Sequence, residues 1–455
     1  MDPAASLWWS TLDRAGTSRP ALQRHLDVDV AIVGGGFSGL WTARELRRRA
    51  PDARIVVIEQ AVCGFGASGR NGGWASALYP LEDAAVTDRH GADTQHHLQR
   101  VLRDAVRDLG AALDEDGIDA HFHQGGTLTF ARSDLQRERL QAAARESDDH
   151  EWLDEHEARE RARVSELRGA LYTPHCARVH PARLVTGLAD AVERLGVQIV
   201  ENTKVLRILP ARAGRRATVV TVGGTVHADV VVRATEGFTP GLPGERRTVA
   251  PLYSLMIATE PLSEAFWEAT GFDGRETFTD GRHLLIYGQR TADDRIAFGG
   301  RGAPYHFGST VEPRFDADDG VFDLLERTLR ELFPHLEGSI THRWGGPLAM
   351  PRDLEPTVTV DHATGLAALG GYTGDGVVLT RVAATALADL LSDPGRTTDF
   401  TTLPFVHHVS RRWEPEPFRW LGINVGLGLA TWSDHYERRT GRPSRATAWL
   451  ERLLG

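Results

Sequence analysis

Lysine is almost absent from this sequence of 455 residues, because Lys204 is the only lysine among 52 basic residues. A phosphate-binding loop of the GxxxxGK[ST] type needs a lysine after its last glycine, and no such motif is present. This absence excludes a Walker-type nucleotide hydrolase. Any reaction that requires a lysine side chain would have to use Lys204.

Cysteine is also rare, and long apolar runs and an excess of positive charge are missing. Cys63 and Cys176 are the only two cysteines, which provides neither a disulfide scaffold nor a CxxC metal framework and fits a reducing compartment. No stretch approaches the roughly 20 apolar residues of a membrane span, and the first residues lack the basic start and apolar core of a signal peptide. The net charge is −10, whereas nucleic-acid-binding proteins usually carry a basic surface. We therefore expect a cytoplasmic protein that spans no membrane and binds no nucleic acid.

A glycine-rich turn near the N-terminus has the pattern of a dinucleotide-binding site. Gly34, Gly36 and Gly39 match GxGxxG between an apolar run at 28–33 and a helical pattern that ends near residue 49. Glu59 ends the next predicted strand. In this arrangement the glycines allow a tight turn and the close approach of a pyrophosphate, the helix N-terminus attracts the phosphates, and the acid accepts hydrogen bonds from ribose hydroxyls. A glycine turn in an ordinary α/β sheet is the alternative.

Two further glycine-rich segments, 61–80 and 370–380, favour FAD over NAD, because a simple NAD dehydrogenase needs neither. The segments with a βαβ-like pattern are separated twice by stretches of other helices and strands. This arrangement predicts two interleaved domains of α/β (α+β) class. We expect an N-terminal arm (1–26) and an aromatic C-terminal extension (401–455). Between them lie a Rossmann-like FAD-binding domain (27–80, 181–240 and 341–400) and a substrate domain (81–180 and 241–340).

Several motifs of this chain occur together in one known family. The chain resembles the D-amino-acid-oxidase-like FAD-dependent oxidoreductases, which include glycine oxidase and monomeric sarcosine oxidase, and is most similar to their gamma-glutamylputrescine oxidase-like branch. The segments that carry the resemblance are GGGFSGL (34–40), GASGRNGG (66–73), ATEGF (234–238), FGGR (298–301), RWGGPLAMPRD (343–353) and GGYTGDGVVLT (370–380).

The resemblance implies a mixed-sheet substrate domain and oxidation of a C–N bond in an amine or amino acid. A hydride would pass to flavin N5 and the imine would hydrolyse, with O2 or another acceptor taking the electrons. We expect non-covalent FAD, because the sarcosine-oxidase type attaches its flavin to a cysteine near the C-terminal end and this chain has none after Cys176. By motif position, the residues that would bind FAD are Gly34, Gly36, Phe37, Ser38, Gly39, Glu59, Gln60, Ala67, Ser68, Gly69, Arg70, Asn71, Gly72, Gly73, Val205, Ala234, Thr235, Gly371, Tyr372, Gly374, Asp375, Gly376 and Val377.

Hydride transfer from a neutral amine needs orientation and exclusion of water more than a catalytic triad. We therefore expect an aromatic pocket with one or two polar anchors, and the candidates by position are Tyr253, His283, Tyr287, Arg301 and Trp344. A role in the core or in an ion pair is the alternative for each. Sarcosine-oxidase-like enzymes use a lysine near the flavin to activate oxygen. Lys204 lies in a predicted adenine-side strand, so His283 or an arginine would replace that lysine, or oxygen is a poor acceptor.

Two other functions stay open at this point. One is a flavin monooxygenase, although GDGVVLT does not match the late motif of that class. The other is a non-catalytic flavoprotein that acts with a partner through its aromatic C-terminal extension. For Cys63 we expect a buried structural thiol, with a thiol beside the flavin as the alternative. We expect no metal site, because the clustered histidines lack suitably spaced carboxylates: His121, His123, His175 and His180.

Overall fold

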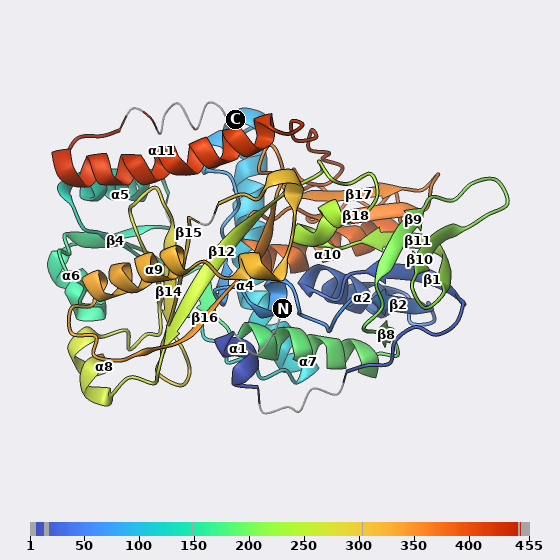
Figure 1. Cartoon of the computed structure of the whole chain (residues 1–455), viewed down its shortest axis with the longest axis horizontal. Coiled ribbons are helices and arrows are strands. Elements are labelled where there is room, and N and C mark those ends of the chain that lie inside the picture. Colours follow the sequence, from blue (N-terminus) through green and yellow to red (C-terminus); the bar gives the residue numbers. More distant parts are fainter. Residues whose placement is uncertain (1–5, 13–17, 148, 303, 445, 447–455) are drawn as a thin grey trace.

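Two eight-stranded sheets, joined by a small two-stranded sheet, form the framework of the protein (Figure 1). The computed structural model describes residues 6–12, 18–147, 149–302, 304–444 and 446. Each large sheet collects strands from separate parts of the chain, as the interleaved patterns in the sequence predict.

The first sheet is parallel at its centre, where β11, β1, β2 and β8 lie side by side. Its middle strands are almost wholly apolar, which is typical of parallel strands covered on both faces. β18 pairs in parallel with β11, and β17, β10 and β9 add antiparallel neighbours. The strands are β1 (Leu26–Val33), β2 (Ile55–Ile58), β8 (Gln198–Val200), β9 (Val205–Leu209), β10 (Ala217–Thr221), β11 (Thr225–Arg233), β17 (Thr357–Asp361) and β18 (Leu366–Gly370).

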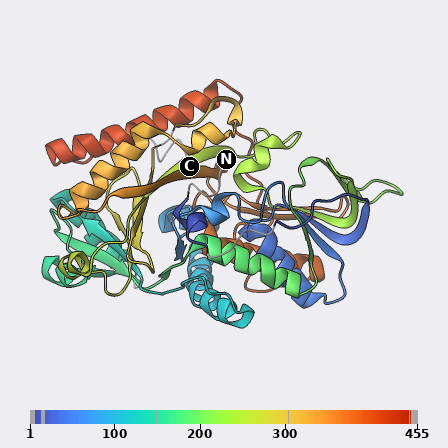
Figure 2. The same ribbon diagram turned by 60° about the horizontal axis from the view of Figure 1, so that its bottom comes forward.

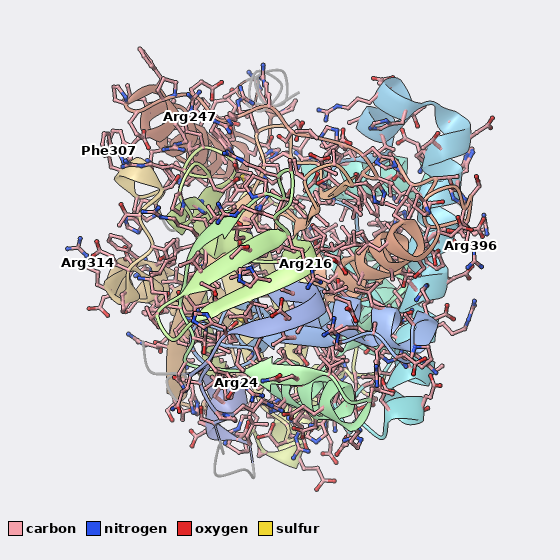
Figure 3. All side chains as sticks on the ribbon, turned by 90° about the vertical axis from the view of Figure 1, so that its right-hand side faces the viewer. Arg24, Arg216, Arg247, Phe307, Arg314 and Arg396 are labelled. Carbon is pink, nitrogen blue, oxygen red and sulfur yellow. The ribbon has the colours of Figure 1, made fainter. Side chains whose placement is uncertain are left out.

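Four long helices contribute most of the helical part of the apolar core that they share with this sheet. They are α2 (Phe37–Arg49), α4 (Ala92–Asp116), α7 (Pro181–Arg194) and α10 (Gly376–Ser392). α10 is buried along nearly its whole length and packs on α2. A second apolar cluster, which includes Val219 and Val226, covers the other face of the sheet. On the side shown in Figure 3, Arg216 is hydrogen bonded to Asp229 at 2.8 Å.

The second sheet is mixed, and its strand order is β16-β12-β15-β14-β13-β4-β6-β5. Neighbouring strands are antiparallel except β13 and β4, which are parallel. The strands are β4 (Thr127–Ala131), β5 (Glu151–Leu153), β6 (Gly169–Thr173), β12 (Ala250–Thr259), β13 (Thr277–Asp280), β14 (Ile286–Arg290), β15 (Ile296–Arg301) and β16 (Ile340–Met350). A substrate domain with a mixed sheet is what the resemblance implies.

One face of the second sheet packs on α9 (Asp319–Leu332) through a phenylalanine-rich core. The long helix α11 (Phe418–Thr440) lies beyond α9, as Figure 2 shows. Ion pairs of Arg438 with Glu331 and of Arg139 with Glu437 hold α11 against α9 and α5. The other helices of the described chain are α1 (Leu7–Ser10), α3 (Asp83–His90), α5 (Asp134–Glu146), α6 (Glu155–Arg161) and α8 (Glu264–Thr270), with short 3-10 turns η2 (Ala67–Gly69), η3 (Glu236–Gly241), η4 (Phe307–Ser309) and η5 (Pro313–Asp316).

The opposite face of the second sheet turns toward the N-terminal helix α1 and the second glycine-rich loop (66–73). Met256, Ala258, Ala297 and Trp344 form a cluster with Trp8 of α1 on this face. The two-stranded sheet of β3 (Trp74–Ser76) and β7 (Cys176–Arg178) lies next to the same loop. The space between the two large sheets is therefore where a cofactor and its substrate could meet.

The division into domains stays a prediction, and one strand lies elsewhere than its predicted domain suggests. β16 falls inside the third predicted FAD-binding piece (341–400), yet it pairs with β12 in the second sheet. In the predicted substrate domain, the short strand β5 separates α5 from α6. Across the part of the chain that the structure describes, no helix is both long and apolar enough to cross a membrane.

Candidate active site

The turn between β1 and α2 leaves no room for a side chain at two of its three motif glycines. Gly34 adopts a φ of +115°, and a Cβ there would lie 2.3 Å from the carbonyl oxygen of Ala234. A Cβ on Gly39 would lie 2.0 Å from the carbonyl oxygen of Gly34. A Cβ on Gly36 would meet only the Ser68 side chain, at 2.8 Å. Gly34 and Gly39 therefore allow strand and helix to pack closely, whereas Gly36 lets the Ser68 side chain approach the start of the helix.

The N-terminus of α2 suits a phosphate group. Its N-cap is Gly36, which has no side chain to cap the helix, and its first turn contains no acidic residue. The Phe37 amide donates to Ser68 Oγ at 2.9 Å, and Ser38 Oγ lies 3.3 Å from the Tyr372 hydroxyl. The unsatisfied amides and the positive end of the helix dipole attract anions at such a terminus.

Glu59 is held at the end of β2 by backbone amides. Its Oε2 accepts from Gly35 N at 2.8 Å and its Oε1 from Ala61 N at 2.9 Å. Burial raises the pKa of this carboxyl, although the amides oppose that effect. A carboxylate oxygen has more than one acceptor position, so Glu59 can also accept hydrogen bonds from ribose hydroxyls. The neighbouring Gln60 is exposed to solvent.

Cys63 and the segment after β8 complete this end of the site. The Cys63 thiol packs beneath Gly35, where a Cβ would come within 2.8 Å of the sulfur. Burial raises the pKa of the thiol well above its usual value, so Cys63 behaves as a buried structural thiol. Thr203 N donates to the Glu59 carbonyl at 2.9 Å, and Val205 begins β9 just beyond it, paired with Thr221.

The second glycine loop (66–73) is anchored through four successive carbonyl oxygens, those of residues 70 to 73. Trp344 Nε1 donates to Arg70 O at 2.9 Å, and Trp8 Nε1 donates to Asn71 O at 2.8 Å. The Gly72 and Gly73 carbonyls accept from Gln289 Nε2 at 2.6 Å and Val179 N at 2.8 Å. Helix α1, strands β14 and β16 and the residue after β7 thus hold the backbone of this loop in place.

Side chains of the same loop reinforce it from within. Asn71 Nδ2 donates to Ala67 O at 3.0 Å, and Asn71 Oδ1 accepts from Gly73 N at 2.8 Å. Arg70 is buried and donates to Asp316 at 3.0 Å and to Gly345 O at 2.9 Å. Its Nη2 atom is buried without a hydrogen-bond partner, which leaves a donor for a bound group.

The third glycine loop (370–376) is fixed by Glu236, a residue that the sequence analysis did not single out. Its carboxylate accepts from Gly371 N at 2.7 Å and from Tyr372 N at 3.2 Å. Burial raises the pKa of Glu236 to about 7, against the effect of the two amides. The motif ATEGF contained the signal, since Glu236 directly follows Ala234 and Thr235.

Helix α10 begins at Gly376, directly after this loop. Asp375 is its N-cap and makes no capping hydrogen bond to the helix. Gly374 adopts a φ of +113°, which an L side chain rarely adopts. The residues predicted to pass the flavin ring therefore lie in a turn that leads directly into a second helix N-terminus. Val377 is buried in the first turn of that helix.

The predicted catalytic side chains fall into two groups. Tyr287 and Trp344 lie against the second glycine loop: a Cβ on Gly72 would come within 2.6 Å of the Tyr287 ring. The Tyr287 hydroxyl is hydrogen bonded to Ser254 Oγ at 2.8 Å. Its ring also meets Trp74 edge to face, with centroids 6.3 Å apart. These two aromatic residues are the predicted side chains that the structure brings to the loop.

The other three candidates lie elsewhere or are not described. The Tyr253 ring belongs to the phenylalanine-rich core on the α9 face of the second sheet. His283 lies before β14, not within a strand, and is hydrogen bonded to Glu437 of α11 at 3.0 Å. Arg301 is opposite Ser254 in the β12–β15 pair, and its side chain lies outside the described residues. Lys204 is exposed beside β9, away from the second glycine loop.

The geometry fits FAD. Two helix N-termini, an anchored carboxylate, glycines at the close approaches and a buried donor on Arg70 are the features that a dinucleotide cofactor uses. FAD, when bound, would be held by these three loops. Among the described residues, no group of three His, Cys, Asp or Glu side chains is placed to hold a metal ion.

Comparisons with known proteins agree with this geometry. The family model described as FAD dependent oxidoreductase matches residues 29–390. A gamma-glutamylputrescine oxidoreductase of Escherichia coli (strain K12) is 29% identical over 411 residues, which cover 88% of this chain and 92% of that protein. A probable oxidoreductase OrdL of Rhizobium meliloti (strain 1021) is 28% identical over 393 residues, covering 84% and 87% of the two chains.

Solved structures show the same fold. Glycine oxidase from Geobacillus kaustophilus superposes with a TM-score of 0.70 at 23% identity, over 85% of this chain and all of that chain. The expected Rossmann-like FAD-binding fold, the FAD cofactor and the oxidoreductase activity are therefore confirmed. The protein belongs to the family of FAD-dependent oxidoreductases typified by D-amino-acid oxidase.

Proposed function

We propose that this protein oxidises the C–N bond of a small amine or amino acid. The observation that carries the proposal is the position of Tyr287 and Trp344, two aromatic side chains of the second sheet, directly against the anchored glycine loop. Relatives of similar length support the substrate class, since one is named a gamma-glutamylputrescine oxidoreductase and another a D-amino acid dehydrogenase.

The chain itself supplies binding, orientation and exclusion of water. FAD, when bound, supplies a two-electron acceptor for the hydride on the carbon that bears the nitrogen. The substrate also loses a proton, and its imine takes up water to give a carbonyl compound and an amine or ammonia. The two electrons would finally pass to O2, with release of hydrogen peroxide, or to another acceptor.

Tyr287 and Trp344 are suited to orienting an amine. Trp344 is buried and its indole N–H is committed to the Arg70 carbonyl, so it presents an apolar ring. Tyr287 is half-buried and shares a hydrogen bond with Ser254, so its hydroxyl is held in one place. An apolar wall with one fixed polar atom holds the amine close to the flavin and keeps water away.

A product balance tests this proposal. The purified holoenzyme is incubated in air with candidate amines, and the carbonyl product, the released amine or ammonia and hydrogen peroxide are quantified. We expect one carbonyl per amine consumed and no consumption of NADPH. Consumption of NADPH with insertion of oxygen into the substrate would instead establish a flavin monooxygenase and contradict the proposal.

A further inference from the structure

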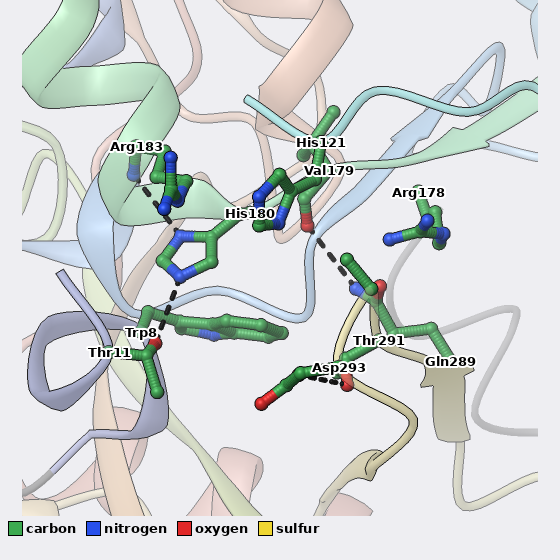
Figure 4. Close-up of a pocket in the computed structure, with 11 residues that line it drawn as sticks. Trp8, Thr11, His121, Arg178, Val179, His180, Arg183, Gln289, Thr291 and Asp293 are labelled. Carbon is green, nitrogen blue, oxygen red and sulfur yellow. Dashed lines mark hydrogen bonds between the residues drawn. The ribbon is translucent and has the colours of Figure 1, made fainter. Parts of the chain in front are cut away.

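Two features of the described chain lie outside the proposed function. One is a cavity of about 170 Å³ between α1, β7 and β14, with Trp8, Val179 and Gln289 in its wall (Figure 4). These three residues donate to the carbonyl oxygens of residues 71 to 73, so the wall of this cavity already serves to hold the second glycine loop. The other feature is the outward side of α11, which lies at the edge of the molecule (Figures 1 and 2).

Helix α11 turns its polar side chains toward the protein. Arg419 is only 2% exposed, and it donates to Glu416 Oε1 at 2.8 Å and to the carbonyl oxygen of residue 246 at 3.0 Å. Asp434 accepts from the backbone amides of residues 283 and 284 at 2.7 and 2.8 Å. Glu437 accepts from Arg139 at 2.8 Å. These hydrogen bonds fix which side of the helix faces the rest of the chain.

The opposite side of α11 carries large apolar side chains that are exposed to solvent. Phe418 is 67% exposed, Leu421 46%, Val425 52% and Trp432 52%. Their spacings of three, four and seven residues place them on one side of the helix. The Tyr436 ring stacks on Trp432 with centroids 5.2 Å apart and extends this side by one turn. We call the surface of these five side chains the outer face of α11.

This orientation is the reverse of the usual one for a helix on the surface of a globular protein. Such a helix normally buries its apolar side and exposes its charged side. Between Phe418 and Tyr436 the only Asp, Glu, Lys or Arg residues are Arg419 and Asp434, and both lie on the side that faces the protein. A contiguous exposed apolar strip of this kind is typical of an interaction surface.

Both ends of the outer face are basic, although the whole chain has a net charge of −10. The exposed arginines near the two ends of α11 are Arg411, Arg412, Arg439 and Arg442. Acidic residues nearby are already paired, Glu414 with Arg352 at 3.1 Å and Glu331 with Arg438 at 3.2 Å. The middle of this surface therefore complements an apolar partner, and its ends complement negative charge.

We propose that the outer face of α11 binds an anionic lipid surface, with the helix lying along the membrane. Helices that bind in this way bury one apolar side at the boundary of headgroups and acyl chains, carry aromatic residues on that side, and are attracted to anionic lipids by their basic residues. The 23 residues of α11 span about 35 Å. One straight helix thus presents the aromatic strip and both basic ends to the same flat surface.

A second copy of the chain complements this face less well. A twofold dimer places the same face against itself, so the arginines at the ends of one helix would meet those of the other whether the helices run parallel or antiparallel. The strip is also small. About 35 Å by 10 Å gives roughly 350 Å², less than the roughly 800 Å² that each partner buries in a stable complex.

Sedimentation of the purified holoenzyme with vesicles tests the proposal. Wild type should bind vesicles of phosphatidylcholine and phosphatidylglycerol in equal parts, and should bind phosphatidylcholine alone at least about fivefold more weakly. Leu421→Ser combined with Trp432→Ser should weaken binding to the mixed vesicles at least about tenfold, because two apolar side chains no longer enter the lipid. Val222→Ser is the matched control, since Val222 is 64% exposed between β10 and β11, and it should bind like the wild type.

The basic ends are tested separately. Arg439→Gln combined with Arg442→Gln should weaken binding to the mixed vesicles about fivefold for each charge removed and leave the weaker binding to phosphatidylcholine unchanged. A chain that ends at Ala446 should still bind, which separates the outer face from residues 447–455. The melting temperature and flavin content of the substituted proteins should match those of the wild type, because each substituted side chain is exposed.

Three outcomes would overturn the inference. The wild type could fail to sediment with the mixed vesicles, or the variant with Leu421→Ser and Trp432→Ser could sediment equally well. Loss of binding in the chain that ends at Ala446 would assign the lipid contact to residues 447–455 instead of α11. A wild-type dimer that this double variant converts to a monomer, with no vesicle binding, would assign the outer face to a second copy. Turnover enters none of these measurements, so they are independent of the proposed oxidation of an amine.

Discussion

Replacing Gly39 with alanine adds one methyl group at the tightest contact of the dinucleotide turn. The new Cβ would lie 2.0 Å from the Gly34 carbonyl oxygen, whereas real Cβ contacts under 3.0 Å essentially never occur. The third neighbour, Ile32, leaves no room on the strand side, since its Cγ2 would be 3.2 Å away. Helix α2 must therefore move about 1 Å from β1, and its amides move with it.

The expected magnitude combines two opposing terms. Overpacking typically costs about 1–3 kcal/mol, while alanine in place of glycine favours a helix by about 1 kcal/mol. The net effect of Gly39→Ala is a loss of up to about 2 kcal/mol in the free energy of unfolding. Loss of one well-aligned hydrogen bond to a pyrophosphate, worth about 1.5–3 kcal/mol, weakens FAD binding at least about tenfold.

Gly422→Ala is a matched control because it makes the same change in a helix where space is open. Gly422 is an exposed residue of α11, and no atom lies within 4 Å of a Cβ built on it. This variant should gain about 1 kcal/mol from helix propensity and bind FAD like the wild type. Urea unfolding and fluorescence titration of flavin-free protein with FAD measure both quantities. Wild-type affinity for FAD in Gly39→Ala, with stability equal to that of Gly422→Ala, would refute the steric reasoning.

Three further predictions concern the loops around the site. Tyr287→Phe removes the hydroxyl held by Ser254 and should lower kcat/KM about tenfold with FAD content unchanged. The control Tyr253→Phe, on the opposite face of the second sheet, should change turnover less. Equal effects of the two variants in stopped-flow assays would remove Tyr287 from the site. The folded-state pKa of Glu236 is about 7, above its ordinary value, so the stability that this residue contributes is full below about pH 4.5 and is lost as the pH rises through 7. In flavin-free protein, the difference in unfolding free energy between wild type and Glu236→Gln should therefore shift by a few kcal/mol over that window. A difference that does not change with pH would contradict the assignment. Trp8→Ala removes a buried ring and its hydrogen bond to the Asn71 carbonyl and should destabilise the protein by about 3–5 kcal/mol, with Trp8→Phe losing less; calorimetric melting that leaves Trp8→Ala at the wild-type temperature would show that α1 does not anchor the loop.

The sequence predicts best the parts of the site that are built by neighbours along the chain. The turn with Gly34 and Gly39 and the acid Glu59 all lie within one βαβ unit, so spacing alone places them together. The helix that begins at Gly376 follows from the same local logic, since a glycine turn precedes a long apolar segment.

The other parts of the site depend on tertiary contacts, which the spacing of residues in the sequence does not reveal. Glu236 acquires its role only when β11 and β18 pair and bring the loop amides to its carboxylate. The indole of Trp8 reaches Asn71 across 63 positions of sequence. His283 is a candidate by its position in the sequence, but its hydrogen bond with Glu437 depends on where α11 lies.

The absorbance spectrum of the purified protein, recorded anaerobically while amines are added, tests the central claim most directly. We predict a bound-flavin spectrum whose visible band bleaches with one equivalent of a suitable amine and returns when an electron acceptor is admitted. A colourless protein that takes up no FAD, or a flavin band that no amine or amino acid bleaches, would contradict the account.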